Sequence, residues 1–196
     1  MNLAIIKYNA GNIQSVLNAL ERLGAPAIVT DDAGLLRAAD KVIFPGVGEA
    51  STAMESLRAS GLDAVLATLR QPVLGICVGM QLLCRHSEEN DTAGLGIIPI
   101  DVKKFPSGRA GLKVPQVGWN TIRDLCSPLF AGVAEESYVY NVHSYYAEDS
   151  IYTIARCNYL VDYAAAIQKD NFYGVQFHSE KSAETGDRIL QNFLAI

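Results

Sequence analysis

The chain has 196 residues, of which 49% are apolar and 19% are charged, and its formal net charge is −5. This length fits a single domain over residues 1–196, and the apolar content is enough for a substantial core. A nucleic acid partner is excluded, because the net charge is negative and the lysines and arginines do not form the basic cluster that binding phosphates requires.

The apolar stretches of the sequence are short, which excludes a segment that spans a membrane. The first residues favour a strand and lack the basic start and long apolar stretch of a signal peptide. The four cysteines lie far apart with no CxxC pair, which is typical of reduced thiols rather than of a disulfide framework. We therefore expect a cytoplasmic protein.

The first 85 residues alternate between short apolar runs and stretches whose apolar residues have helical spacing. We expect strands at residues 3–8, 27–30, 41–45 and 72–76. We expect helices at residues 13–23, 54–57, 62–69 and 78–85. Asn12 is a candidate cap for the first helix and Gly24 a candidate end. This alternation predicts a parallel sheet with helices on both faces.

The second half consists mainly of short apolar runs joined by turns, which favours antiparallel pairing. The expected strands are residues 97–105, 114–123, 138–142, 151–158, 163–169 and 172–177. A helix is predicted at residues 185–194. The two halves together predict the α/β class, with a largely parallel sheet flanked by helices on both faces and added antiparallel strands.

One pentapeptide, Gly75-Ile76-Cys77-Val78-Gly79, lies between an apolar strand and an apolar helix. This is the pattern of a nucleophile elbow, whose sharp turn needs small residues two positions on either side of the nucleophile. The start of a helix also favours a thiolate over a thiol. The N–H of Val78 would face a developing oxyanion. A small buried cysteine in an ordinary turn is the competing interpretation.

His178 is the best candidate for the base that a cysteine nucleophile needs. It ends the last predicted strand, and ligands bind at the carboxyl edge of a parallel sheet. Glu180 follows two residues later, so in extended backbone both side chains would face the same way. A carboxylate next to an imidazole fixes its tautomer, which is the orienting role in a catalytic triad.

The two other histidines are less well placed for this role. His86 lies beside acidic residues at the end of a predicted helix, and His143 directly follows the predicted strand at residues 138–142; each fits an ordinary histidine whose polar atoms are satisfied within the protein. The histidines, cysteines and acidic residues show no metal-ligand spacing, so we expect neither a metal nor a cofactor.

A glycine-rich loop, Pro45-Gly46-Val47-Gly48, follows the predicted strand at residues 41–45. Glycines at such a place let backbone N–H groups approach a ligand closely. A phosphate loop is excluded because no Gly-Lys-Ser/Thr follows. Together with the elbow, the loop predicts further oxyanion donors at Val47 and Gly48.

Residues 72–83 and 174–180 resemble the nucleophile segment and the His-x-Glu segment of class I (triad-type) glutamine amidotransferases. Within that class, residues 45–48, 115–120 and 140–145 resemble the glutaminase subunits of imidazole glycerol phosphate synthase. The resemblance runs over nearly the whole chain, from Gly11 to Leu194.

The resemblance implies hydrolysis of glutamine through a thioester on Cys77, with His178 as acid and base and Glu180 orienting it. It implies a glutamine site made of Gly46, Gly48, Gln81, Glu89, His143, Ser144 and Tyr145. It also implies a heterodimer with a cyclase subunit that folds as a (β/α)₈ barrel. That subunit would use the ammonia to make imidazole glycerol phosphate and aminoimidazole carboxamide ribonucleotide in histidine biosynthesis.

Four positions depart from the family pattern. Ser179 replaces the usual proline of His-Pro-Glu, and Lys7 stands where an acidic residue is common. Gln116 and Val117 replace the usual histidine and methionine before Gly-Trp-Asn. We expect Gln116 and Lys7 to affect partner contacts.

Other functions compete with this interpretation. They are a glutaminase of another synthase, a non-catalytic subunit of the same fold, and a cysteine peptidase of related fold.

Overall fold

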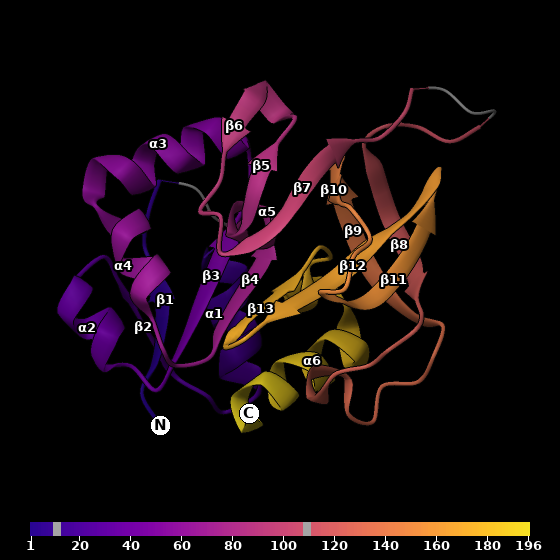
Figure 1. Ribbon diagram of the computed structural model, residues 1–196. Coiled ribbons are helices and arrows are strands. Elements are labelled where there is room, and N and C mark those ends of the chain that lie inside the picture. Colours follow the sequence, from indigo (N-terminus) through magenta and orange to yellow (C-terminus); the bar gives the residue numbers. More distant parts are fainter. Residues whose placement is uncertain (10–12, 108–110) are drawn as a thin grey trace.

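The computed structural model describes residues 1–9, 13–107 and 111–196 (Figure 1). The predicted cap Asn12 lies outside the described residues. The helices are α1 (Ile13–Arg22), α2 (Ala33–Ala38), α3 (Ala50–Ser60), α4 (Leu62–Thr68), α5 (Val78–Leu83) and α6 (Ala183–Ala195). The shorter 3-10 turns are η1 (Glu89–Asp91), η2 (Pro128–Phe130) and η3 (Ser179–Lys181). No helix in the described ranges combines the length and apolarity that crossing a membrane requires.

The strands of the first half are β1 (Leu3–Ile6), β2 (Ala27–Thr30), β3 (Lys41–Gly46), β4 (Val73–Cys77), β5 (Cys84–Ser87) and β6 (Thr92–Ala93). Those of the second half are β7 (Ile98–Lys104), β8 (Gln116–Ile122), β9 (Ser137–His143), β10 (Tyr145–Ala147), β11 (Thr153–Tyr159), β12 (Val161–Lys169) and β13 (Phe172–Val175). Across the described residues, an 11-stranded sheet has the order β2-β1-β3-β4-β13-β12-β10-β7-β5-β6, with β11 paired to β12. β8 and β9 form a separate antiparallel pair.

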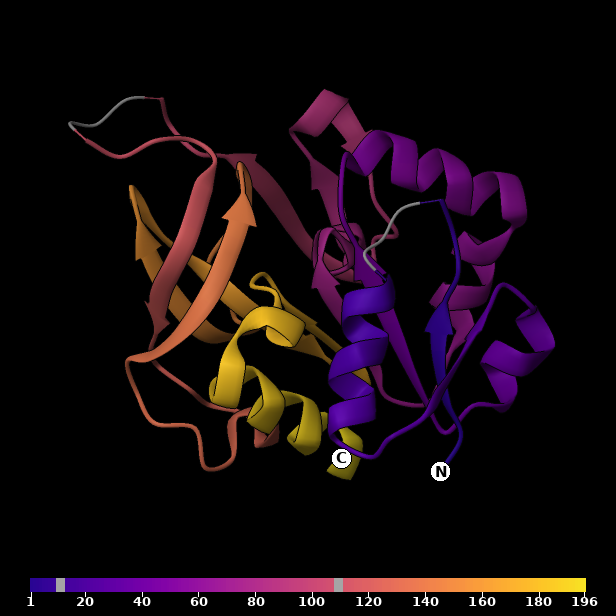
Figure 2. The ribbon, with the colours of Figure 1, turned by 180° about the vertical axis from the view of Figure 1, so that it is seen from behind.

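The centre of the large sheet is parallel, from β2 through β1, β3 and β4 to β13. Antiparallel pairs of β13, β12, β11, β10 and β7 extend it. α1 and α6 lie against one face, and α3 and α4 lie against the other (Figure 1, Figure 2). The predicted largely parallel sheet with helices on both faces and added antiparallel strands is therefore confirmed.

Local sequence explains how the first half is built. β4 is buried along its whole length, which its uninterrupted apolar residues allow. α1 directs Val16, Ala19 and Leu20 into the core. Gly61 adopts a left-handed conformation with φ of 70°, so it ends α3 and starts α4 within one residue.

The predicted helix at residues 78–85 is too long. α5 ends at Leu83, because Cys84 is already extended (φ −72°, ψ 170°) and starts β5, which pairs in parallel with β7. The short elements α2, β5, β6 and β10 were not predicted. Each has too few residues for a periodic pattern to stand out, and tertiary pairing determines it.

Strands β3, β4 and β13 end at the same edge of the sheet. Gly46 of β3 is in register with Cys77 of β4, and Val175 of β13 is in register with Ile76. The loop after β3, the elbow after β4 and the His-x-Glu segment after β13 therefore meet at one place.

Candidate functional site

Cys77 lies at the junction of β4 and α5 in a strained conformation, with φ of 55° and ψ of −113°. Non-glycine residues rarely adopt positive φ, and this is the geometry of a nucleophile elbow. A Cβ on Gly79 would lie 1.9 Å from the Phe44 carbonyl oxygen, and one on Gly75 would lie 2.8 Å from the Met80 nitrogen. Both glycines are therefore required for the turn, as the sequence predicts.

His178 follows β13 and is held by both its backbone and its ring. Its N–H donates to the Tyr140 carbonyl at 2.9 Å. The ring lines the same cavity as Cys77, and Nδ1 lies 2.8 Å from Glu180 Oε1. The backbone differs from the extended form that the sequence suggested, because Ser179–Lys181 form the turn η3. The structure nevertheless places the imidazole between the thiol and the carboxylate.

The charge state of His178 is determined by opposing effects. Burial lowers its pKa, but the hydrogen bonds and negative charges of Cys77 and Glu180 outweigh burial and raise the pKa from 6.5 to about 10. The protonated ring therefore stabilises the folded chain fully below about pH 6.5, and this contribution is lost as the pH rises towards 10. A protonated imidazole next to sulfur favours the thiolate.

The loop after β3 packs tightly against the elbow. A Cβ on Gly46 would lie 2.5 Å from the Gly79 nitrogen, so only glycine fits there. Gly48 has φ of +88°, a conformation that glycine adopts without strain. The Tyr8 hydroxyl donates to the Pro45 carbonyl at 2.7 Å and ties the loop to the end of β1. Sequence reasoning did not find this tyrosine.

A cavity of about 350 Å³ opens at this edge of the sheet, within the range of about 300–1,000 Å³ that is typical of small-molecule sites. Most of the predicted site residues line it: Val47, Gly48, Cys77, Val78, Gln81, Glu89, His143, Ser144, Tyr145 and His178. Gly46 and Glu180 do not line this cavity; they lie next to Val47 and His178, which do.

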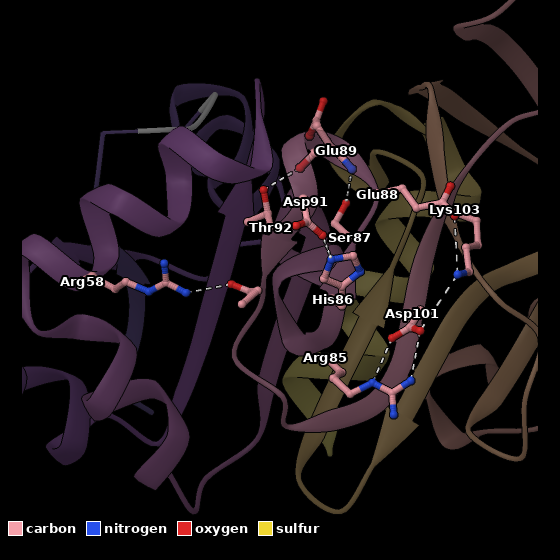
Figure 3. A network of polar contacts seen from close by, with 11 residues as sticks. Arg58, Arg85, His86, Ser87, Glu88, Glu89, Asp91, Thr92, Asp101 and Lys103 are labelled. Carbon is pink, nitrogen blue, oxygen red and sulfur yellow. Dashed lines mark hydrogen bonds and ion pairs between the residues drawn. The ribbon is translucent and has the colours of Figure 1, made fainter.

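Glu89 belongs to a polar network at the rim of the cavity (Figure 3). Its N–H donates to Ser87 Oγ at 3.1 Å, and the Thr92 hydroxyl donates to its carbonyl at 2.5 Å. Its carboxylate accepts the Ala50 N–H at 2.7 Å. Burial raises the pKa of Glu89, and the bond from Ala50 opposes that rise. A cationic group of a ligand would stabilise this half-buried carboxylate.

His143 uses both ring nitrogens within the protein. Nδ1 lies 2.7 Å from the Tyr145 carbonyl oxygen, and Nε2 lies 3.3 Å from the Tyr163 hydroxyl. The ring also packs against Phe105, with centroids 5.3 Å apart. Burial lowers the pKa of His143 to about 4, so the ring is neutral at pH 7. Contact of the imidazole with a substrate would require breaking these bonds.

His86 lies apart from the cavity lining, as the sequence predicts. Its Nε2 lies 2.8 Å from Asp91 Oδ1, in a pair whose side chains are 34% and 96% exposed (Figure 3). In the described ranges, histidines, cysteines and carboxylates form no group of three or more that could hold a metal ion.

Besides Tyr8, the site includes Lys181 and Gln176, which sequence reasoning also missed. Lys181, on η3, lines the cavity. Gln176 is fully buried, and its Nε2 lies 3.8 Å from Cys77 Sγ. A signal for Gln176 was available, because it precedes His178 by two residues and is polar at the end of an apolar strand.

The departures from the family pattern lie in different environments. Gln116 is buried and accepts a hydrogen bond from the Tyr163 hydroxyl at 3.1 Å. Its amide therefore faces the interior, so an effect on partner contacts would be indirect. Lys7 lies on the surface, 3.9 Å from Asp31. Ser179 is buried, and its hydroxyl has no hydrogen-bond partner among the described residues.

Comparison with known proteins agrees with this geometry. The family "Glutamine amidotransferase class-I" matches residues 4–196. "Imidazole glycerol phosphate synthase subunit HisH" of Bacteroides thetaiotaomicron is 55% identical over 194 residues, covering 99% of each chain. The protein of that name from Bacteroides fragilis is 56% identical over 196 residues and covers 100% of both. That from Shewanella sediminis is 47% identical and covers 98% of this chain and 89% of the relative.

Solved structures share the fold at lower identity. A putative GMP synthase subunit from Thermoplasma acidophilum has a TM-score of 0.76 at 20% identity, covering 100% of this chain and 93% of that one. PurLQS from Thermotoga maritima has a TM-score of 0.72 at 18% identity, covering 99% and 97%. The full-length relatives confirm the resemblance found in the sequence. The chain belongs to the class-I glutamine amidotransferase family.

Proposed function

We propose that this chain is the glutaminase subunit of an imidazole glycerol phosphate synthase. The observation that carries the proposal is that an elbow cysteine and an imidazole line the same cavity, with a buried carboxylate 2.8 Å from the imidazole. The full-length similarity to subunits that carry this name favours that synthase over other glutamine-dependent synthases.

The geometry supports a two-step hydrolysis with Cys77 as nucleophile. His178 takes the thiol proton, and sulfur attacks the side-chain amide carbon of glutamine. His178 then returns the proton to the leaving nitrogen, so that ammonia departs and a glutamyl thioester remains. Water activated by His178 cleaves the thioester and releases glutamate. Glu180 holds the ring in the tautomer that each transfer needs.

Backbone donors next to Cys77 would stabilise the oxyanion of each tetrahedral intermediate. Val47, Gly48 and Val78 line the cavity around the sulfur. One such donor typically contributes about 10²- to 10³-fold to kcat. Gly46 contributes by permitting close packing of the loop against the elbow.

The remaining wall would hold the substrate. Glu89 would pair with the ammonium of glutamine, which offsets the cost of burying this carboxylate. Gln81, Ser144 and Tyr145 would contact the rest of the molecule. His143 would contribute through its main chain, because protein groups occupy its ring nitrogens.

The ammonia would pass to a cyclase subunit with the fold of a (β/α)₈ barrel, and the two chains would form a heterodimer. That subunit would form imidazole glycerol phosphate and aminoimidazole carboxamide ribonucleotide. The β8–β9 pair presents exposed apolar side chains suited to docking, with Val117 60%, Trp119 53% and Tyr138 62% exposed. Neither subunit reaction as proposed requires a cofactor on this chain.

A covalent glutamine analogue tests the proposal. The diazo ketone 6-diazo-5-oxo-L-norleucine should label Cys77 alone, read by mass spectrometry of the peptides, and glutamine should protect it. Affinity purification from the native cell should recover the cyclase subunit. Labelling elsewhere, or recovery of a different synthase, would contradict the proposal.

A further inference from the structure

Two buried glutamine side chains are linked by hydrogen bonds to each other and, through Gln176, to the thiol of Cys77. Gln176 is 0% exposed and Gln81 is 4% exposed. Gln176 leaves the end of β13 two residues before His178, and Gln81 projects from α5 one turn after Cys77. Burying a primary amide is unfavourable unless its polar atoms find partners. Their hydrogen bonds therefore indicate what these amides do.

The hydrogen bonds form a chain that ends at the sulfur. Gln81 Nε2 donates to the Tyr145 carbonyl at 3.1 Å and to Gln176 Oε1 at 3.0 Å. Gln176 Nε2 then lies 3.8 Å from Cys77 Sγ, within the range of an N–H to sulfur hydrogen bond.

The direction of this chain is determined by its first member. A backbone carbonyl can only accept, so the Gln81 amide must present its nitrogen to Tyr145. Both N–H groups of Gln81 are then used, and Gln176 must present its oxygen to Gln81. If the Gln176 amide were reversed, two NH₂ groups would face each other. The group that faces Cys77 is therefore an N–H donor.

A donor in this position acts on the charge of the sulfur. The amide nitrogen cannot accept a proton from the thiol, and its hydrogen bond is stronger to a thiolate than to a thiol. The carbonyl of Val142, 3.9 Å from Sγ, can accept from the thiol and favours the neutral form. His178, whose pKa is raised by its interactions with Cys77 and Glu180, supplies a positive charge near the sulfur. Gln176 adds a neutral donor that does not depend on the protonation of His178.

We propose that Gln176 is a catalytic residue that stabilises the Cys77 thiolate through Nε2. Gln81 is the positioning residue that orients the Gln176 amide. The proposal rests on the proposed function, since it concerns the nucleophile of that site. The thiol proton still passes to His178. Both N–H groups of Gln81 are occupied, so only its Oε1 is left to contact a substrate, as the acceptor of a substrate N–H.

The pH dependence of Cys77 alkylation tests this role without turnover. Gln176→Met keeps a similar length and removes the donor, and the matched control is Gln168→Met, whose amide accepts from Ser127 on another part of the sheet. Alkylation by iodoacetamide is followed on the Cys77 peptide by mass spectrometry, because Cys126 is exposed and would react as well.

We expect the midpoint pH of Cys77 alkylation to rise by about one unit in Gln176→Met. This corresponds to a roughly tenfold change in the thiol–thiolate equilibrium, the low end of what a hydrogen bond to a charged acceptor contributes. The kcat for glutamine hydrolysis at neutral pH should fall by about the same factor. Gln168→Met should behave as the parent. An unchanged midpoint in a folded Gln176→Met chain would overturn the proposal. A change in KM alone would also overturn it, because it would mean that Gln176 only holds Gln81 in place.

A second variant covers the case in which Gln176→Met does not fold. Gln176→Asn keeps a neutral amide but shortens the side chain by one methylene, which withdraws the donor from the sulfur without adding a charge. A purely structural role predicts the parental midpoint, and thiolate stabilisation predicts a midpoint above that of the parent. Failure here would leave labelling of Cys77 by the glutamine analogue intact, so it is distinguishable from failure of the proposed function.

Discussion

Replacing Glu180 with glutamine would remove the negative charge next to His178 while keeping the length of the side chain. Glu180 Oε1 lies 2.8 Å from His178 Nδ1, and the side chains are 2% and 6% exposed. Water can neither screen this contact nor replace it. The new amide could also donate to Nδ1, which would stabilise the tautomer that cannot take a proton from Cys77.

The expected size of the effect follows from this bond. Burial lowers the pKa of His178, and Cys77 and Glu180 raise it to about 10. A hydrogen bond to a charged group contributes about 1.5–3 kcal/mol, so the pKa of His178 in Glu180→Gln should fall by about one to two units. With the tautomer no longer fixed, kcat for glutamine hydrolysis should fall by about 10²- to 10⁴-fold.

The assay is glutamate release at saturating glutamine by the chain in complex with its cyclase, together with an NMR titration of the His178 ring. Asp91→Asn is the matched control, because Asp91 Oδ1 also lies 2.8 Å from an imidazole nitrogen, that of His86, but is exposed. Exposed ion pairs contribute little free energy, so Asp91→Asn should keep the parental kcat. If Glu180→Gln behaves like Asp91→Asn, the buried pair does not orient the base and our reasoning is wrong.

Three further predictions concern the same edge of the sheet. His178→Ala should lower kcat by about 10²- to 10⁴-fold at saturating glutamine, whereas His143→Ala should act mainly on stability and KM. A larger loss of kcat in His143→Ala than in His178→Ala would show that the base was misassigned. The isolated chain should be a poor glutaminase that its cyclase and nucleotide activate, and Gly48→Val, which resists φ of +88°, should reduce activation more than complex formation. Equal kcat with and without the cyclase would exclude this switch. Gly79→Ala should lower the free energy of unfolding in urea by about 1–3 kcal/mol or more, because its Cβ would lie 1.9 Å from the Phe44 carbonyl, and parental stability would contradict that packing.

Local signals in the sequence predicted the parts of the site that depend on backbone geometry. Gly75 and Gly79 indicate the elbow because no larger side chain fits beside Met80 and Phe44. The positions of β1, β3 and β4 follow from their apolar runs, since a parallel sheet covered on both faces buries its inner strands completely.

Long-range pairing could not be predicted in the same way. β13 comes from the end of the chain but pairs with β4, and only this pairing brings His178 to Cys77. The same pairing places Gln176 against the sulfur, which its position in a strand alone does not reveal. His143 lies in a segment with the family pattern, yet its ring binds Tyr145 and Tyr163. The sequence pattern identifies the segment but not the direction of the side chain.

The central claim is that Cys77 performs glutamine hydrolysis while a separate subunit uses the ammonia. The most direct measurement compares the Cys77→Ala complex with the parent complex, first with glutamine and then with ammonium salt as nitrogen source. We predict that Cys77→Ala releases no glutamate from glutamine but forms imidazole glycerol phosphate from ammonia at the parental rate. Glutamate release at the parental rate by Cys77→Ala would contradict the assignment of the nucleophile.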